Sequence, residues 1–172
     1  MPMLLLIYIL NANSFSVVFL MAMIFGWLGD IGIKFSVVVG MLLFGVEHIF
    51  YTVYLLGSLS GFNILMALPI ILVLTVILVF LYRKLRCYAS SNMRIPVLCY
   101  SIILCIMTFS CIYKFVDAMN ISNLLLMFGG ILFMISDSIL SFEIFKKETK
   151  LGGFMVMLTY ILAQVLITSG CM

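Results

Sequence analysis

Long runs of apolar residues, separated by short polar segments, make up almost the whole chain. A helix that crosses the hydrocarbon core of a bilayer needs about 20 predominantly apolar residues. Six runs meet or approach that length, and they lack the alternation of apolar and polar positions expected of membrane β-strands. We therefore predict six membrane-spanning helices, over residues 15–28, 35–56, 64–81, 95–115, 121–142 and 152–168.

A seventh apolar run, residues 3–10, is too short to span the membrane in the ordinary way and should form a short N-terminal helix. Because the connections are short, neighbours in sequence should be antiparallel and closely packed. The sequence thus predicts an all-α, polytopic transmembrane helical bundle of six full spans plus this short helix, as a single integral membrane domain over residues 1–172.

Composition agrees with this class. Of the 172 residues, 66% are hydrophobic and 9% charged, whereas a soluble domain has about a quarter charged residues. The net charge of +3 comes from connecting segments, so we interpret it as a topology signal rather than as nucleic-acid binding. The five cysteines form no CxxC pair, and we expect neither disulfides nor a metal cluster.

The basic residues indicate an orientation in the membrane. They gather in two segments, Arg83, Lys84, Arg86 and Arg94 in the first and Lys146, Lys147 and Lys150 in the second. Two spans separate these segments, so both lie on one side, which the positive-inside rule makes cytosolic. A predicted loop with Asp30 and Lys34 then also faces the cytosol, and the C-terminus faces outside. Lys114, beside Asp117, is the exception.

A few polar side chains lie inside the predicted spans, where ionisable groups are unfavourable and usually functional. Asp137 lies about nine residues, or roughly 13 Å, from the basic boundary of its span. His48 should lie near the midplane and Asp30 at the cytosolic boundary. The full set is Asp30, Glu47, His48, Tyr51, Ser136, Asp137, Tyr160 and Gln164. We predict that these groups share one pocket that opens towards the inner leaflet.

Each polar residue alone also has a structural explanation. An intramembrane histidine often serves only to hydrogen-bond neighbouring helices, as Tyr160 and Gln164 would, and Asp30 would cap a helix. Spacing nevertheless puts His48 and Tyr51 on one helix face, and Tyr160 and Gln164 on another. The set contains two acids, a histidine and a Tyr–Gln pair at compatible depths. In the membrane these groups must form hydrogen bonds with one another, so the set as a whole favours a functional site.

Three segments, in order, resemble motifs of the lysoplasmalogenase-like YhhN family of multi-pass membrane proteins. They are "GWLGDIGIKFSVVVGMLLFGVEHIFYTVYL" with its Gly-Asp and His-x-x-Tyr, "GGILFMISDSILSFEIFKK" with its Ser-Asp, and "LTYILAQVLITSG" with its Tyr-x-x-x-Gln. The resemblance covers nearly the whole chain. Family members usually have about eight helices and a Lys-Pro ahead of the first run matched here, whereas this chain begins "MPMLLL", so we expect at least one helix fewer.

The resemblance implies a hydrolase that cleaves the vinyl ether bond of lysoplasmalogens, and we expect no cofactor. Its products are a fatty aldehyde and glycerophosphoethanolamine or glycerophosphocholine. Transfer of the family motifs onto matching positions implies catalytic residues Asp137, Asp30 and His48 and substrate-binding residues Tyr51, Ser136, Tyr160 and Gln164. The expected partners are a lysophospholipid substrate and the bilayer, and not nucleic acid.

This chemistry suits the residues. Vinyl ethers hydrolyse by slow protonation at carbon, which gives an oxocarbenium ion that water attacks. The enzyme needs a protonated acid and a nearby carboxylate, as glycosidases do. Our hypothesis assigns Asp137 as general acid and Asp30 as cation stabiliser or water activator, with the reverse assignment open. His48 and Tyr160 would orient water or the leaving oxygen, and Gln164 would hold the head group.

Three alternatives remain at the level of sequence. A zinc hydrolase is less favoured, because catalytic zinc usually takes three protein ligands with His prominent and only one His is present. A transporter or lipid flippase would use Asp137 as a proton or ion site, yet the chain shows no inverted repeat. A non-enzymatic membrane scaffold would use Asp137 and His48 only for packing.

Overall fold

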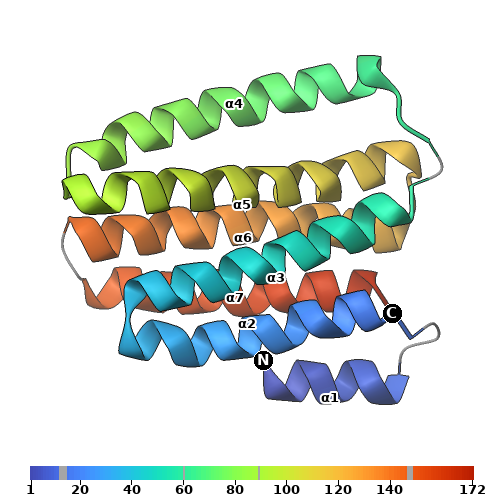
Figure 1. The fold of residues 1–172 in the computed structure, drawn as a ribbon. Coiled ribbons are helices and arrows are strands. Elements are labelled where there is room, and N and C mark those ends of the chain that lie inside the picture. The colour runs from blue at the N-terminus through green and yellow to red at the C-terminus, as the bar shows by residue number, and fades with distance from the viewer. Residues whose placement is uncertain (12–14, 60, 89, 147–148) are drawn as a thin grey trace.

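The computed structural model describes residues 1–11, 15–59, 61–88, 90–146 and 149–172. Lys147, predicted as part of the second basic segment, lies outside these residues. Within them the chain is helical and contains no strand, which confirms the predicted all-α class. The helices, drawn in Figure 1, are α1 (Pro2–Asn11), α2 (Val17–Phe35), α3 (Val37–Gly57), α4 (Ile64–Arg86), α5 (Ser91–Asp117), α6 (Ile121–Phe145) and α7 (Lys150–Gly170).

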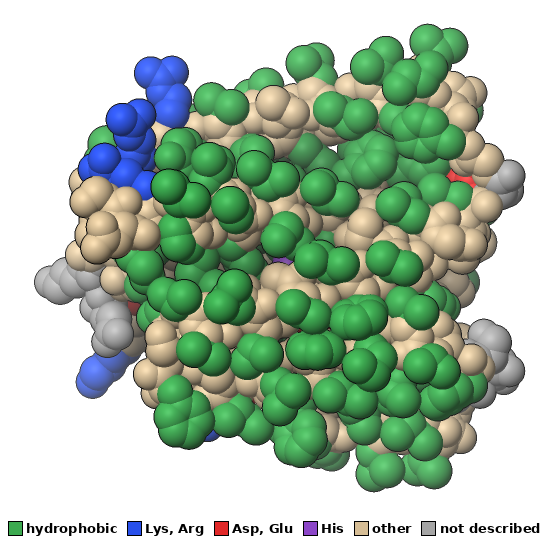
Figure 2. All heavy atoms as spheres, in the orientation of Figure 1, with side chains coloured by type: hydrophobic (Ala, Val, Ile, Leu, Met, Phe, Trp, Pro, Cys, Tyr) green, Lys and Arg blue, Asp and Glu red, His purple; other side chains and the backbone are tan. Residues whose placement is uncertain are grey.

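Six of the described helices, α2 to α7, are long and apolar enough to cross a membrane, and α1 is the short N-terminal helix that the sequence predicts. Large apolar side chains are exposed along all of them and cover the face seen in Figure 2. Exposure of so large an apolar surface to water is unfavourable, whereas its contact with lipid hydrocarbon is not. The chain is therefore a multi-pass membrane protein.

The predicted loop around Asp30 and Lys34 is wrong. Helix α2 continues through both residues to Phe35, and only Ser36, with an extended backbone, separates it from α3. The glycines of this segment, which suggest a loop in the sequence, instead let α2 lie close to α3. A Cβ atom on Gly29 would lie 2.9 Å from the ring of Phe44. Small residues at helix contacts are typical of membrane bundles.

Consecutive helices run antiparallel, as Figure 1 shows, but they do not all pack together. Helix α3 packs against α2 and α5, α6 against α5 and α7, and α1 against α2 and α7. Helix α4 packs against α5 and α6 and, among the described residues, its backbone does not come close to that of α3, so close packing of all sequence neighbours is wrong at this point. Only 11% of its most apolar window is buried, so α4 lies at the edge of the bundle with most of its circumference facing lipid.

Basic side chains gather at one end of the bundle, on the left in Figure 2. This end holds the last turns of α2 and α4, the first turn of α5 and the α6–α7 connection, with Lys34, Arg83, Lys84, Arg86, Arg94, Lys146 and Lys150. Lys114 lies at the opposite end, where its Nζ atom donates a hydrogen bond to the carbonyl of Ser58. One basic end is what the positive-inside rule requires. That this end faces the cytosol remains a prediction.

The close packing of α6 on α7 predicts the effect of adding one methyl group. A Cβ atom on Gly129 would lie 2.7 Å from Cγ1 of Ile167 and 3.1 Å from the carbonyl oxygen of Ala163. Overpacking of this kind costs about 1–3 kcal/mol, which outweighs the gain of about 1 kcal/mol in helix propensity. We expect Gly129→Ala to lower the thermal unfolding midpoint in detergent by several degrees.

Gly153→Ala is the matched control on α7, because a Cβ atom there would meet nothing within 4 Å. This variant should be as stable as the parent or slightly more stable. Equal midpoints for the two variants would contradict the close approach of α6 and α7.

Candidate functional site

Three helices bring a histidine, a tyrosine and an aspartate together inside the bundle. The hydroxyl of Tyr100 (α5) donates a short hydrogen bond to Oδ2 of Asp137 (α6) and lies 3.3 Å from Nε2 of His48 (α3). His48 Nε2 and Asp137 Oδ2 are 3.8 Å apart. Tyr100 donates its hydroxyl proton to Asp137, which leaves its oxygen free to accept a hydrogen bond. His48 can donate that bond when its imidazole proton is on Nε2. We call these three residues the Asp137 group.

Local packing fixes the Asp137 group in place. Gly130 lies two turns before Asp137 on the same face of α6, and a Cβ atom there would come within 2.9 Å of Cβ of Cys111 on α5. Helix α6 can therefore approach α5 closely enough for Asp137 to meet Tyr100. The imidazole of His48 is fully buried and packs edge-on against Phe133, with ring centroids 4.6 Å apart and an interplanar angle of 89°.

A second hydrogen-bonded group joins α3 to α7. Gln164 accepts a hydrogen bond of 3.0 Å from the Tyr51 hydroxyl and donates one of 2.7 Å to Oε1 of Glu47. All three side chains are fully buried. Glu47 and Tyr51 are one turn apart on α3, so both reach the same partner. The carboxyl of Glu47 lies against Gly26 of α2, where any Cβ atom would collide with it.

Asp30 and Tyr160 form the third part of the site. The carboxyl of Asp30 (α2) lies next to the hydroxyl of Tyr160 (α7), which makes no hydrogen bond of ordinary geometry. The Tyr160 ring packs edge-on against Phe133, at 5.6 Å between centroids and 89°, and so shares that ring with His48. Asp30 is about one third exposed and also lies 3.8 Å from the nitrogen of Met1.

Glu47 connects these three parts. It precedes His48 on α3 and is hydrogen-bonded to Gln164. The carboxyls of Asp30 and Asp137 both lie close enough to act electrostatically on it. The structure thus brings together six of the seven predicted site residues, in three adjoining groups. Ser136 is the exception, because its hydroxyl donates to the carbonyl of Val156 and serves to join α6 to α7.

The site has buried polar atoms without partners, and two small cavities border Asp137. Oε2 of Glu47, Nδ1 of His48 and the hydroxyl of Tyr160 are buried without a hydrogen bond, although buried polar atoms nearly always have one. Asp137 borders two cavities, of about 20 Å³ between α2, α3, α5 and α6 and of about 30 Å³ between α4, α5 and α6. Each is large enough for one water molecule. Among the described residues Asp137 thus borders two small cavities, and one pocket shared by all the predicted residues stays a prediction.

Tyr100 is the residue that the sequence analysis missed, and Glu47 was noted there only as a polar residue. Tyr100 lies in the apolar run of α5. The sequence marks this position only by two successive hydroxyl-bearing residues, Tyr100 and Ser101, inside a membrane span. A phenol within a membrane span needs a hydrogen-bond partner, and this need is the signal that indicates Tyr100 as a candidate. Among the described residues, no three His, Cys, Asp or Glu side chains gather in the manner of a metal site.

Comparison with known proteins agrees with the motifs. The model of the YhhN family matches residues 1–171, almost the whole chain. The chain belongs to the YhhN family. Membership of the YhhN family links the chain to lysoplasmalogenase-like proteins, as the resemblance implies. No match was found among the curated proteins or the solved structures.

Gln164 provides a test of the second group. Gln164→Leu removes the donor to Glu47 and the acceptor of Tyr51 at once, and each buried group left without a partner costs about 1–3 kcal/mol. We expect a clear fall in the unfolding midpoint in detergent. Adding Glu47→Leu should recover part of the loss, because the unpartnered carboxyl is then removed. Strictly additive losses in this double-mutant cycle would contradict the pairing.

Proposed function

We propose that this YhhN-family protein is a membrane-embedded hydrolase that cleaves the vinyl ether bond of lysoplasmalogens. The products would be a fatty aldehyde and glycerophosphoethanolamine or glycerophosphocholine. The observation that supports the proposal is the Asp137 group, in which a buried carboxyl meets two further proton-carrying side chains beside water-sized cavities. Asp137 lies eight residues before the end of α6, or about 12 Å inside the helix end.

The reaction requires a proton at carbon and a water molecule. An acid protonates the alkenyl carbon that does not carry oxygen, and the positive charge spreads over the other alkenyl carbon and the ether oxygen. Water adds to that carbon and gives up one proton to a carboxylate, which leaves a hemiacetal. The hemiacetal then breaks its bond to the glycerol oxygen, which takes the second proton, and the aldehyde keeps the oxygen of water.

The residues of the site suit these steps. Asp137 would deliver the proton, and as a carboxylate it would then face the cation. Tyr100 and His48 orient the Asp137 carboxyl and, through their own exchangeable protons, would restore its proton. Asp30, beside Tyr160, would supply the second carboxylate that stabilises the cation or accepts the proton from water. The reverse assignment of Asp30 and Asp137 uses the same residues.

The orientation of the substrate follows from the charges. A lysolipid in the leaflet at the basic end would present its phosphate to the Lys and Arg side chains there. Its vinyl ether, next to the glycerol, would lie slightly deeper, which is where Asp137 lies. We propose that this leaflet is the cytosolic one, with the C-terminus outside.

The direct test is to incubate the purified protein with a lysoplasmalogen and with its ester-linked analogue. We expect free aldehyde from the vinyl ether substrate only, and in D2O one deuterium on the carbon next to the aldehyde carbon, measured by mass spectrometry after trapping. Asp137→Asn should lower the rate by about 10²- to 10⁴-fold, the usual contribution of a general acid. Movement of intact lysolipid across the membrane of protein-containing liposomes, without aldehyde release, would instead support a transporter.

Asp117→Asn is the matched control, since it makes the same carboxyl-to-amide change at the far end of α5. This variant should keep the parent rate. If Asp137→Asn released aldehyde as fast as Asp117→Asn in a folded protein, the role of Asp137 would be wrong.

Tyr100→Phe separates orientation from packing, because it removes only the hydroxyl. We expect kcat to fall by about 10- to 100-fold, as Asp137 and His48 lose the group that holds them in position. Tyr113→Phe is the control on the same helix, because the buried Tyr113 hydroxyl accepts a hydrogen bond from the backbone of Asn63 at the other end of α5. A similar loss of kcat in both variants would contradict the assignment.

A further inference from the structure

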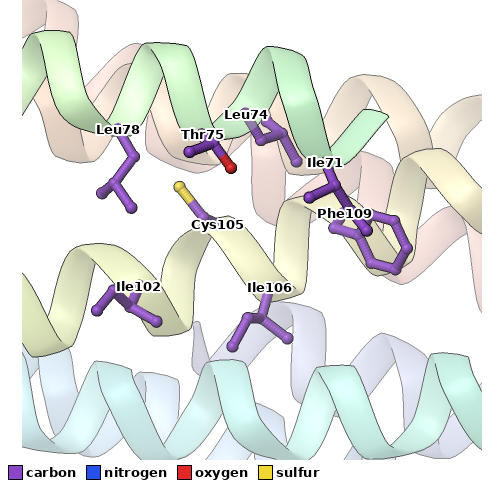
Figure 3. Close-up of a pocket in the computed structure, with 8 residues that line it drawn as sticks. All are labelled: Ile71, Leu74, Thr75, Leu78, Ile102, Cys105, Ile106 and Phe109. Carbon is purple, nitrogen blue, oxygen red and sulfur yellow. The ribbon is translucent and has the colours of Figure 1, made fainter. Parts of the chain in front are cut away.

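An apolar groove runs between α4 and α5. It has a volume of about 380 Å³ and is lined by Ile71, Leu74 and Leu78 of α4 and by Ile102, Cys105 and Phe109 of α5, among others. Figure 3 shows Leu78 and Thr75 of α4 extending towards Cys105 of α5 in the space between the two helices. The exposed edge position of α4 leaves the groove accessible from the lipid.

The groove adjoins the Asp137 group. The cavity of about 30 Å³ that borders Asp137 and Tyr100 is also lined by Leu78 and Cys105, which belong to the groove as well. The groove therefore differs from an ordinary gap between lipid-facing helices, because it adjoins a cavity that a buried carboxyl borders.

The groove also has a direction relative to the charged end of the bundle. Leu78 lies eight residues before Arg86, the end of α4, and so about 12 Å from that end, which is the depth of Asp137. Ile71 lies about 22 Å from the same end. A second, outer groove along α4 runs from Thr75, which both grooves share, to Arg83 and Lys84. Along the membrane normal the order is thus basic residues, carboxyl and apolar groove.

We propose that the groove between α4 and α5 binds the hydrocarbon chain of a single-chain lysophospholipid, whose phosphate lies near Arg83 and Lys84 and whose first chain carbons lie beside Asp137. The order of phosphate, linkage and chain in such a lipid is the order of these three features along α4. Inside a bilayer an apolar chain gains little by leaving other chains, so the groove acts mainly by orienting the linkage towards Asp137. This proposal rests on the proposed function for the chemistry, but not for the binding.

Cys105 reports on occupancy of the groove. It is half-buried and lines the groove, whereas Cys99 on the same helix is exposed and does not line it. The full chain in detergent micelles is treated with an apolar maleimide, with or without an alkyl-ether lysophosphatidylethanolamine, which has no vinyl ether and is not cleaved. Alkylation of each cysteine is measured by mass spectrometry.

Alkylation of Cys105 should slow by about tenfold when the probe is near ten times its Kd, since about one site in eleven is then free. Cys99 should be unaffected, and diacyl phosphatidylethanolamine should protect Cys105 much less. Unchanged Cys105 alkylation, or equal protection by the diacyl lipid, would overturn the proposal. The probe is not a substrate, so this binding test is independent of the enzyme assay. Protection of Cys105 by the probe, together with no aldehyde release from lysoplasmalogen, would reject the proposed reaction but support the binding site.

Chain-length selectivity gives a second test. Ile71→Trp places a bulky side chain at the end of the groove far from Asp137, and Leu72→Trp places the same side chain on the neighbouring, 66% exposed position outside the groove. For a long-chain substrate, Ile71→Trp should lower kcat/KM by about 10- to 100-fold through misplacement of the linkage. A short-chain substrate ends before it reaches Ile71. For that substrate, Ile71→Trp and Leu72→Trp should have the same kcat/KM. Equal effects of the two variants, or losses independent of chain length, would overturn the proposal.

Discussion

The hydrogen bond that Tyr100 donates to Asp137 is the contact on which the site depends. A carboxyl within a membrane bundle is shielded from bulk water, so side chains of other helices must supply most of its hydrogen bonds. Tyr100 and His48 supply them from α5 and α3, and this requirement fixes how α3, α5 and α6 lie relative to one another. The same three side chains can hold and exchange a proton, so one arrangement meets the structural requirement and supports the proposed chemistry.

Glycine positions make these polar contacts possible. Gly130 lets α6 approach α5 at the Asp137 group, Gly26 leaves room for the Glu47 carboxyl, and Gly29 accommodates the ring of Phe44. In lipid the hydrophobic effect does not drive helices together, so close packing and hydrogen bonds between helices must do so. Hydrogen bonding is incomplete at Oε2 of Glu47 and Nδ1 of His48, which are buried without a partner.

The number and approximate extent of the helices could be predicted, because a bilayer imposes one length and one composition on every span. The depths of Asp137 and His48 followed from the rise of a helix, and their meeting could be anticipated. Three features could not. Gly29 and Gly32 suggest a loop in the sequence but form a helix contact in the fold. Helix α4 packs against α5 and α6 and, in the part of the chain that the structure describes, not closely against α3. Ser136 donates to a backbone carbonyl instead of joining its neighbour Asp137. Each depends on tertiary packing, which local patterns do not contain.

The single histidine of the chain offers the most direct test that Asp137, Tyr100 and His48 form one hydrogen-bonded group. The protein is labelled with 15N-histidine and the two ring nitrogens are observed by NMR in lipid nanodiscs. We predict that Tyr100→Phe and Asp137→Asn each shift the Nε2 resonance, whereas Tyr113→Phe leaves it in place. An Nε2 resonance that is the same in the parent and in both site variants would contradict the account.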